Sequence, residues 1–160
     1  MLKVITNTTL DELSQKAAEA PRRRMNLNHH DNLADPINRM LNAFEPGTYV
    51  QPHKHENPEK REVFVVLRGS LVVVFFDNDG KPIEFVLLNR ENGNYAVEID
   101  PGTWHTVISL ETGSVVYEIK DGPYFPENDK NFAGWAPKEN EDGCGEYLKM
   151  LTNQYYSLQK

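Results

Sequence analysis

The chain has 160 residues, of which 39% are hydrophobic and 26% charged, and its net charge at pH 7 is −7. These values are typical of a globular protein that buries its core in one domain, and the acidic balance argues against nucleic acid as a partner. No apolar run is long enough to cross a membrane and the first residues show no secretory signal, so we expect a cytoplasmic single domain over residues 1–160.

Short helices are predicted at the two ends of the chain. At the N-terminal end, Thr9 is the expected N-cap of a helix over residues 10–20, because Glu12 follows three residues later as in a capping box. Near the C-terminal end, residues 146–158 carry an apolar stripe at helical spacing. Such a stripe favours core packing or a subunit contact over a ligand site.

Between these helices the sequence predicts many short strands separated by Gly, Pro and Asn turns. The predicted strands are 24–30, 38–44, 49–55, 63–67, 71–76, 83–88, 95–99, 106–110 and 115–120. Strands about ten residues apart are typical of an all-β sandwich or jelly roll. We therefore expect a barrel core over about residues 24–120 and a C-terminal extension over residues 121–160.

The first predicted strand carries a polar face. Alternation along the strand puts four polar side chains on one side: Arg24, Asn26, Asn28 and His30. Such a row suits the hydroxyls and phosphate of a sugar or sugar nucleotide, with the arginine binding an anion bidentately. A solvated edge strand explains the same pattern equally well.

A candidate metal site lies further along the chain. His53 and His55 are two residues apart on a predicted strand, so their imidazoles point to the same side, roughly 6 to 7 Å apart. Turns can bring Glu62 and His105 to the same place from other strands. Three imidazoles and one carboxylate suit a divalent transition metal such as Fe, Mn, Ni, Co or Zn. Glu59 is the alternative carboxylate, although Glu62 leads directly into a strand.

The same stretches resemble the cupin signatures. Gly47, His53-Lys54-His55, Glu62 and Gly69 resemble the first signature, and residues 101–105 resemble the end of the second. The gap between His55 and Glu62 is longer than is usual in cupins. The resemblance implies a cupin double-stranded β-helix, a jelly-roll barrel that holds its metal inside.

Further stretches are similar to one branch of this superfamily, the WbuC-type cupin fold metalloproteins. They are residues 24–29, 52–55, 64–69, 104–106, 122–126 and 135–137. This resemblance implies a homodimer and a role in the biosynthesis of bacterial surface polysaccharide such as O-antigen. The implied substrate is a small polar molecule, a carbohydrate.

Other residues are candidates for the walls of the pocket. Gln51 and Tyr49 share the parity of His53 and His55 on the predicted strand, so both are candidates to line the cavity. Tyr49 is a candidate catalytic acid or base, although filling the barrel is the role that we favour for it. Trp104, next to His105, is a candidate ligand-binding residue. It either lines the pocket or only packs against other side chains.

Several functions are compatible with these residues. The interpretation that we favour is isomerisation or epimerisation of a sugar with the metal as a Lewis acid. The alternatives are an Fe(II)-dependent dioxygenase, a metal-free epimerase that uses a histidine and Tyr49, and a non-enzymatic module that binds a small ligand. A cupin whose histidines are hydrogen-bonded without metal also fits the sequence.

Overall fold

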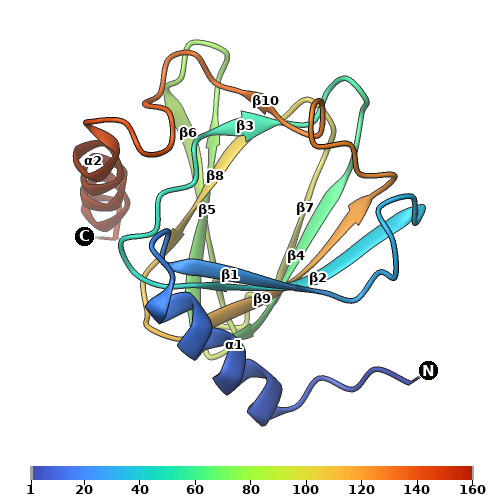
Figure 1. Ribbon diagram of the computed structural model, residues 1–160. Helices are drawn as coiled ribbons and strands as arrows, with labels where there is room; N and C mark the ends of the chain where they lie inside the picture. Colours follow the sequence, from blue (N-terminus) through green and yellow to red (C-terminus); the bar gives the residue numbers. More distant parts are fainter. Residues whose placement is uncertain (1, 160) are drawn as a thin grey trace.

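The computed structural model describes residues 2–159, which form two antiparallel β-sheets with a helix near each end of the chain (Figure 1). The strands of the first sheet, in spatial order, are β1 (Arg24–Asn28), β2 (Ile37–Phe44), β9 (Ser114–Asp121), β4 (Glu62–Arg68) and β7 (Ala96–Ile99). Those of the second sheet are β10 (Asn131–Phe132), β3 (His53–Lys54), β8 (Trp104–Ser109), β5 (Ser70–Phe76) and β6 (Pro82–Asn89). The all-β jelly-roll barrel with short terminal helices is confirmed.

The main apolar core lies between the two sheets. Alternation along the strands sends Phe64 and Val66 of β4 inward, where they meet Val73 of β5 and Val107 of β8. All four side chains are buried. The apolar core occupies part of the space between the sheets, and the rest is lined by polar side chains.

Helix α1 (Asn7–Glu19) packs on the outer face of the first sheet through Leu10 and Leu13. Its N-cap is Thr6, so the prediction of Thr9 was wrong by one helical turn. The backbone N–H of Thr9 donates to Oγ1 of Thr6 at 3.2 Å, and the Thr9 hydroxyl accepts from the Thr6 backbone. The hydroxyl of Thr9 thus takes the place that the sequence assigned to Glu12 in a capping box.

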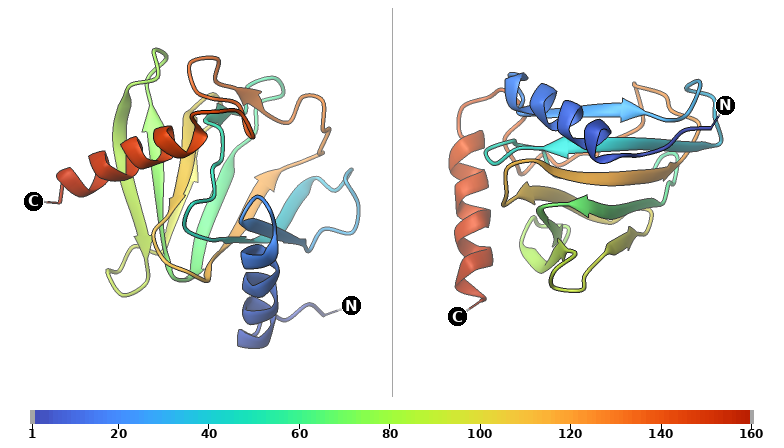
Figure 2. Two further views of the ribbon diagram at one scale, coloured as in Figure 1. Left: turned by 60° about the vertical axis from the view of Figure 1, so that its left-hand side comes forward. Right: turned by 90° about the horizontal axis from the view of Figure 1, so that it is seen from below.

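Helix α2 (Cys144–Ser157) covers the outer face of the second sheet, and Figure 2 shows the two helices on different sides of the molecule. Its Leu151 and Tyr155 are buried against Val72, Val74 and Ile108. This part of the apolar stripe therefore packs within the chain, whereas Met150 and Leu158 of the same stripe are exposed. Among residues 2–159, neither helix is both long and apolar enough to span a membrane.

The predicted strand over residues 49–55 is much shorter in the structure. Only His53–Lys54 forms β3, because Pro52 has no N–H to donate to a neighbouring strand. The carbonyl of Pro52 instead accepts from the backbone N–H of Ala133 in the C-terminal extension. The extension also supplies β10, a two-residue strand paired with β3, which the sequence did not predict.

Candidate metal centre and adjoining cavity

Three histidines and one glutamate meet inside the barrel. His53 on β3 lies directly opposite His105 on β8, and their ring centroids are 4.5 Å apart. The ring of His55 lies 5.3 Å from that of His53, and Glu62 reaches the same place from β4 in the other sheet. All four side chains are buried, and one potential ligand atom from each lies within 4.8 Å of the others.

The backbone fixes the orientation of each imidazole. Nδ1 of His53 lies 3.0 Å from the carbonyl oxygen of Gln51, and Nδ1 of His105 lies 2.9 Å from that of Thr103. Nδ1 of His55 contacts the carbonyl oxygen of Asp129. A carbonyl can only accept, so each Nδ1 carries the proton and each Nε2 keeps its lone pair. This is the tautomer in which histidines bind metals through Nε2.

The contacts of Glu62 also fit a cation. Its Oε2 lies 3.0 Å from Nε2 of His105 and 3.5 Å from Nε2 of His55. Nε2 of His55 is buried and has no hydrogen-bond partner among the described residues. Since these nitrogens and the carboxylate are all acceptors, a shared cation would satisfy them together. Ligands about 2.1 Å from one ion lie within about 4.2 Å of each other, so a small contraction would complete the site.

Burial and neighbouring charges set the protonation of this cluster. Burial lowers the pKa of His53 well below its ordinary value, and the charge of Lys130 lowers it further. Burial alone would raise the pKa of Glu62, but the close contact with His105 and the charge of Lys120 hold that pKa well below its ordinary value. A neutral imidazole and an ionised carboxylate are the forms that bind a metal.

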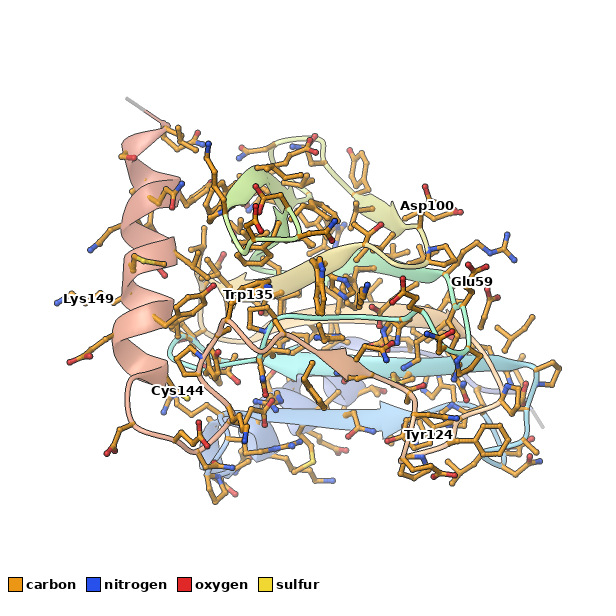
Figure 3. All side chains as sticks on the ribbon, turned by 90° about the horizontal axis from the view of Figure 1, so that it is seen from above. Glu59, Asp100, Tyr124, Trp135, Cys144 and Lys149 are labelled. Carbon is orange, nitrogen blue, oxygen red and sulfur yellow. The ribbon has the colours of Figure 1, made fainter. Side chains whose placement is uncertain are left out.

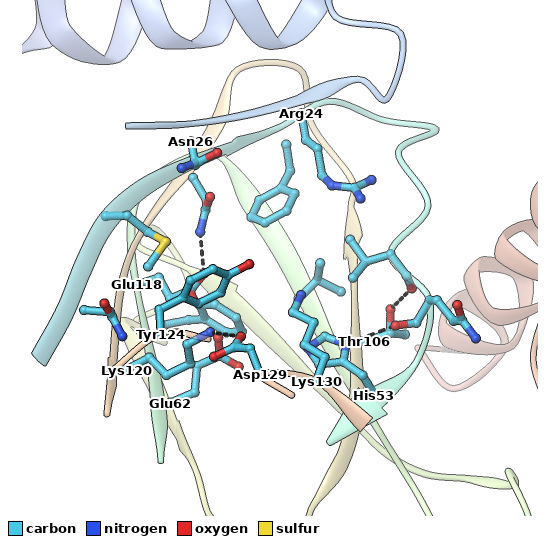
Figure 4. Close-up of a pocket in the computed structure, with 18 of the residues that line it drawn as sticks. Arg24, Asn26, His53, Glu62, Thr106, Glu118, Lys120, Tyr124, Asp129 and Lys130 are labelled. Atoms are coloured by element: carbon cyan, nitrogen blue, oxygen red, sulfur yellow. Dashed lines mark hydrogen bonds and ion pairs between the residues drawn. The ribbon is translucent and has the colours of Figure 1, made fainter. Parts of the chain in front are cut away.

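A cavity of about 620 Å³ adjoins the cluster, and His53, Glu62 and His105 form part of its wall (Figure 4). Its polar lining is rich in amides: Asn26 and Asn28 on β1, Asn38 and Asn42 on β2, and Gln51 just before β3. The amide of Asn38 is buried and neither of its polar atoms has a partner among the described residues. The cavity can therefore offer both donors and acceptors to a small polar ligand.

A buried group of charged side chains borders one part of the cavity through Glu118, Lys120 and Asp129, and the sequence did not predict it. The carboxylate of Asp129 binds Nζ of Lys120 at 2.6 Å and Nζ of Lys60 at 2.8 Å. Glu118 accepts a hydrogen bond from Asn42. Glu118 and Lys120 are two residues apart on β9, so strand alternation could have placed both on the inner face. Lys60 and Asp129 lie in loops, where no such pattern exists.

The predicted polar face of β1 borders the cavity, and its residues also bind one another or the extension. Arg24 donates to the carbonyl of Tyr49 at 2.8 Å and to the carboxylate of Glu139 at 2.5 Å. Nδ2 of Asn26 donates to Oδ1 of Asn28 at 2.7 Å. The guanidinium of Arg24 is thus engaged by the protein itself, which leaves it little capacity to bind a ligand anion bidentately.

His30 and Gln51 also line the cavity, and each is held by the backbone. Nδ1 of His30 accepts from the backbone N–H of Arg39 at 3.1 Å, and Nε2 of Gln51 donates to the carbonyl of Ala133 at 3.0 Å. These bonds fix the two side chains in the wall.

Neither Tyr49 nor Trp104 lines the cavity, which corrects the expectation that Tyr49 could face it. Of the two roles expected for Trp104, lining the pocket or only packing, the structure shows packing. Residues 49–52 are not a strand, so the parity argument fails for Tyr49; its hydroxyl donates to the carbonyl of Pro137 at 2.6 Å, and burial raises its pKa. Trp104 precedes the inward-pointing His105 on β8 and therefore points outward, where its ring lies 5.9 Å from that of Trp135.

The alternative carboxylate, Glu59, lies away from the cluster. Its side chain is exposed on a turn, whereas Glu62 is buried beside the histidines. Figure 3 shows Glu59 in the same outer region of the molecule as Asp100. The structure brings together the three histidines and Glu62, and Glu59 is not part of this group.

Solved structures with a similar fold include members of the cupin superfamily. KdgF from Halomonas sp. is 19% identical, with a TM-score of 0.50 over 65% of this chain and 82% of that chain. CapF, solved with the inhibitor 3-isopropenyl-tropolone, is 21% identical, with a TM-score of 0.53 over 68% of this chain and 34% of that one. Oxalate decarboxylase from Bacillus subtilis is 17% identical, with a TM-score of 0.51 over 68% and 27%. The similarity identifies the fold as a cupin barrel.

Comparison at the level of sequence gives a family. No curated protein matches the chain. A family model described as a domain of unknown function, DUF6016, matches residues 5–88, a stretch that includes His53, His55 and Glu62 and covers just over half of the chain. The chain is therefore a cupin-fold member of the DUF6016 family.

Proposed function

We propose that the protein binds one divalent transition metal through Nε2 of His53, His55 and His105 and the carboxylate of Glu62. One observation carries this proposal: three backbone carbonyls accept hydrogen bonds from the Nδ1–H groups, so that three Nε2 lone pairs converge beside a buried carboxylate. Three nitrogens and one oxygen suit Fe, Mn, Ni, Co or Zn.

The cavity beside this centre is the proposed binding site for a small polar ligand. Its volume of about 620 Å³ is within the range of small-molecule sites. The unpartnered amide of Asn38 supports a ligand with hydroxyl groups, such as a carbohydrate, because a hydroxyl both donates and accepts. Leaving a buried amide unpaired costs about 1–3 kcal/mol, which such a ligand would recover.

A bound divalent ion would supply Lewis acidity, which polarises substrate oxygens and makes a neighbouring proton easier to remove. The residues of the chain would orient the substrate and exchange its proton. Asn38 and the amides of β1 and β2 would orient the hydroxyls, and Glu118 lies in the cavity wall where a substrate proton could be exchanged. Isomerisation or epimerisation of a sugar is the reaction that this arrangement would serve.

Other parts of the sequence-based interpretation stay predictions. These are the WbuC-type assignment, the role in surface-polysaccharide synthesis, the homodimer and the cytoplasmic location. An Fe(II) dioxygenase would use the same four ligands, and consumption of oxygen with a substrate would distinguish it. A binding module would hold the ligand without turnover.

Metal content tests the proposal. The purified protein is stripped with a chelator, reloaded with Zn²⁺, Mn²⁺ or anaerobic Fe²⁺, desalted, and analysed by inductively coupled plasma mass spectrometry. We expect about one ion per chain in the native protein and in Glu59→Gln, the matched control with an exposed carboxylate. His55→Ala and Glu62→Gln should lose the ion while keeping their circular dichroism spectra. Native protein without stoichiometric metal, or full occupancy in both site variants, would contradict the proposal.

A further inference from the structure

Lys130 differs from the other lysines around the candidate centre. It lies just before β10, lines the cavity, and extends into it near His53 (Figure 4). The ammonium groups of Lys60 and Lys120 both bind the carboxylate of Asp129. Among residues 2–159, Lys130 makes no salt bridge or side-chain hydrogen bond, and only part of its surface is exposed. A lysine in this position has an unused charge and three unused donors.

The carboxylates of the cavity are committed elsewhere. The single negative charge of Asp129 already faces two ammonium groups. Glu62 lies among the histidines, and Glu118 is bound by Asn42. Once a doubly charged ion joins the cluster, this end of the cavity carries an excess of positive charge. Buried charge without a partner is unfavourable, so the loaded site favours an anion.

The other basic residues that line the cavity are paired with carboxylates or exposed at the surface, so they do not offer a free cation near the candidate centre. Arg24 is paired with Glu139, and the side chain of Arg22 lies 3.8 Å from the same carboxylate. Lys138 is exposed at the surface and lies 3.9 Å from Glu141. Lys130 is therefore the cation of the lining that is both close to the candidate centre and without a partner.

We infer that Lys130 binds the anionic group of the ligand, so that the ligand of this cavity is a small oxyanion, a carboxylate or a phosphate, held between the Lys130 ammonium and the metal centre. This inference rests on the proposed function and narrows its ligand class from polar molecules to acidic ones. β10 pairs with β3 at Phe132 and His53, which fixes the segment that carries Lys130 next to one of the candidate ligands.

Anion binding to Co²⁺-loaded protein tests the inference. The visible spectrum of Co²⁺ responds to a change in its ligands, and calorimetry gives the affinity independently of any activity. The probes are glycolate, inorganic phosphate and, as the neutral counterpart, ethylene glycol. The variants are Lys130→Gln, Lys130→Arg and the matched control Lys149→Gln, which removes the same charge from the exposed side of α2 (Figure 3).

We expect glycolate or phosphate to bind the native protein and Lys149→Gln equally, and to bind Lys130→Gln at least about tenfold more weakly, since a charge-assisted hydrogen bond is lost. Lys130→Arg should recover part of the affinity. Whichever probe binds more tightly identifies the anion as carboxylate or phosphate. Equal affinity of Lys130→Gln and native protein, or preference of the native protein for ethylene glycol, would overturn the inference. Cobalt content is measured first in every variant, so failure to load the metal would count against the proposed function instead.

Discussion

The imidazole of His55 donates its Nδ1–H to the backbone carbonyl of Asp129, whose carboxylate binds Lys60 and Lys120. One residue of the C-terminal extension thus orients a candidate ligand and closes a buried ionic network. The extension is for this reason part of the site, and the stability of the fold and the affinity for metal should both depend on Asp129.

Replacing Asp129 with Asn tests this link. The change removes the carboxylate that binds the buried ammonium groups of Lys60 and Lys120, and breaking a buried ion pair costs about 3–5 kcal/mol. We expect a loss of that size in the free energy of unfolding measured in urea. Metal affinity should fall by about 10-fold or more, because the backbone carbonyl of residue 129, which orients His55, shifts when the ion pairs are lost. Asp121→Asn, which breaks an exposed pair with Arg61, is the control and should cost about 1 kcal/mol or less. Equal stabilities of the two variants would contradict the account.

Tyr49→Phe separates a structural role from a catalytic one. The Tyr49 hydroxyl donates to the carbonyl of Pro137 outside the cavity, so its loss should cost about 1 kcal/mol of stability. Metal content and ligand affinity should equal those of the native protein. A variant with native stability and impaired ligand binding or turnover would return Tyr49 to the list of catalytic candidates.

The sequence predicted most of the strands and the four clustered side chains because each rests on a short, regular pattern. Glu62 could be preferred over Glu59 because it begins a strand, and the structure buries Glu62 while leaving Glu59 exposed. His105 follows a turn that sets the start of β8. Alternation along β1 likewise predicted the polar side chains that now border the cavity.

The features of the site that the sequence did not predict depend on contacts between segments that are distant along the chain. Asp129 and Lys130 lie in a loop with no periodicity, and their positions follow from the pairing of β10 with β3. Tyr49 was misplaced because Pro52 interrupts the strand on which the parity argument depended. Arg24 binds Glu139, which is 115 residues away along the chain, and local sequence patterns do not predict such a contact.

The stability of the metal-free protein should decrease in acid. Burial holds the pKa of His53 below the value of 6.5 that it has when unfolded, so the unfolded chain binds more protons as the pH falls below about 6.5. The free energy of unfolding is therefore at its full value above that pH and declines below it. The depressed pKa of Glu62 adds a loss of the same sign below its ordinary pKa of 4.5. Urea titrations at several pH values measure the free energy of unfolding. In His53→Gln this free energy should depend less steeply on pH near pH 6. A stability that rises on acidification would contradict it.

Gly122 should not tolerate a side chain. A Cβ at this position would lie 2.0 Å from the backbone oxygen of Asp35 and 3.1 Å from Nδ2 of Asn38. Gly122→Ala should therefore destabilise the protein by about 1–3 kcal/mol and disturb the cavity wall. Gly134→Ala is the matched control, because a Cβ there meets no atom within 4 Å. The comparison uses thermal unfolding, and similar melting temperatures for the two variants would show that the contact with Asp35 relaxes easily.

The position of a bound metal tests the central claim most directly. A crystal of the reloaded protein, measured at the absorption edge of the chosen metal, gives an anomalous difference map that locates the ion without reference to activity. The account expects one strong peak about 2.1 Å from Nε2 of His53, His55 and His105 and from a carboxylate oxygen of Glu62. A peak held by other residues, with no ion among these four side chains, would contradict it.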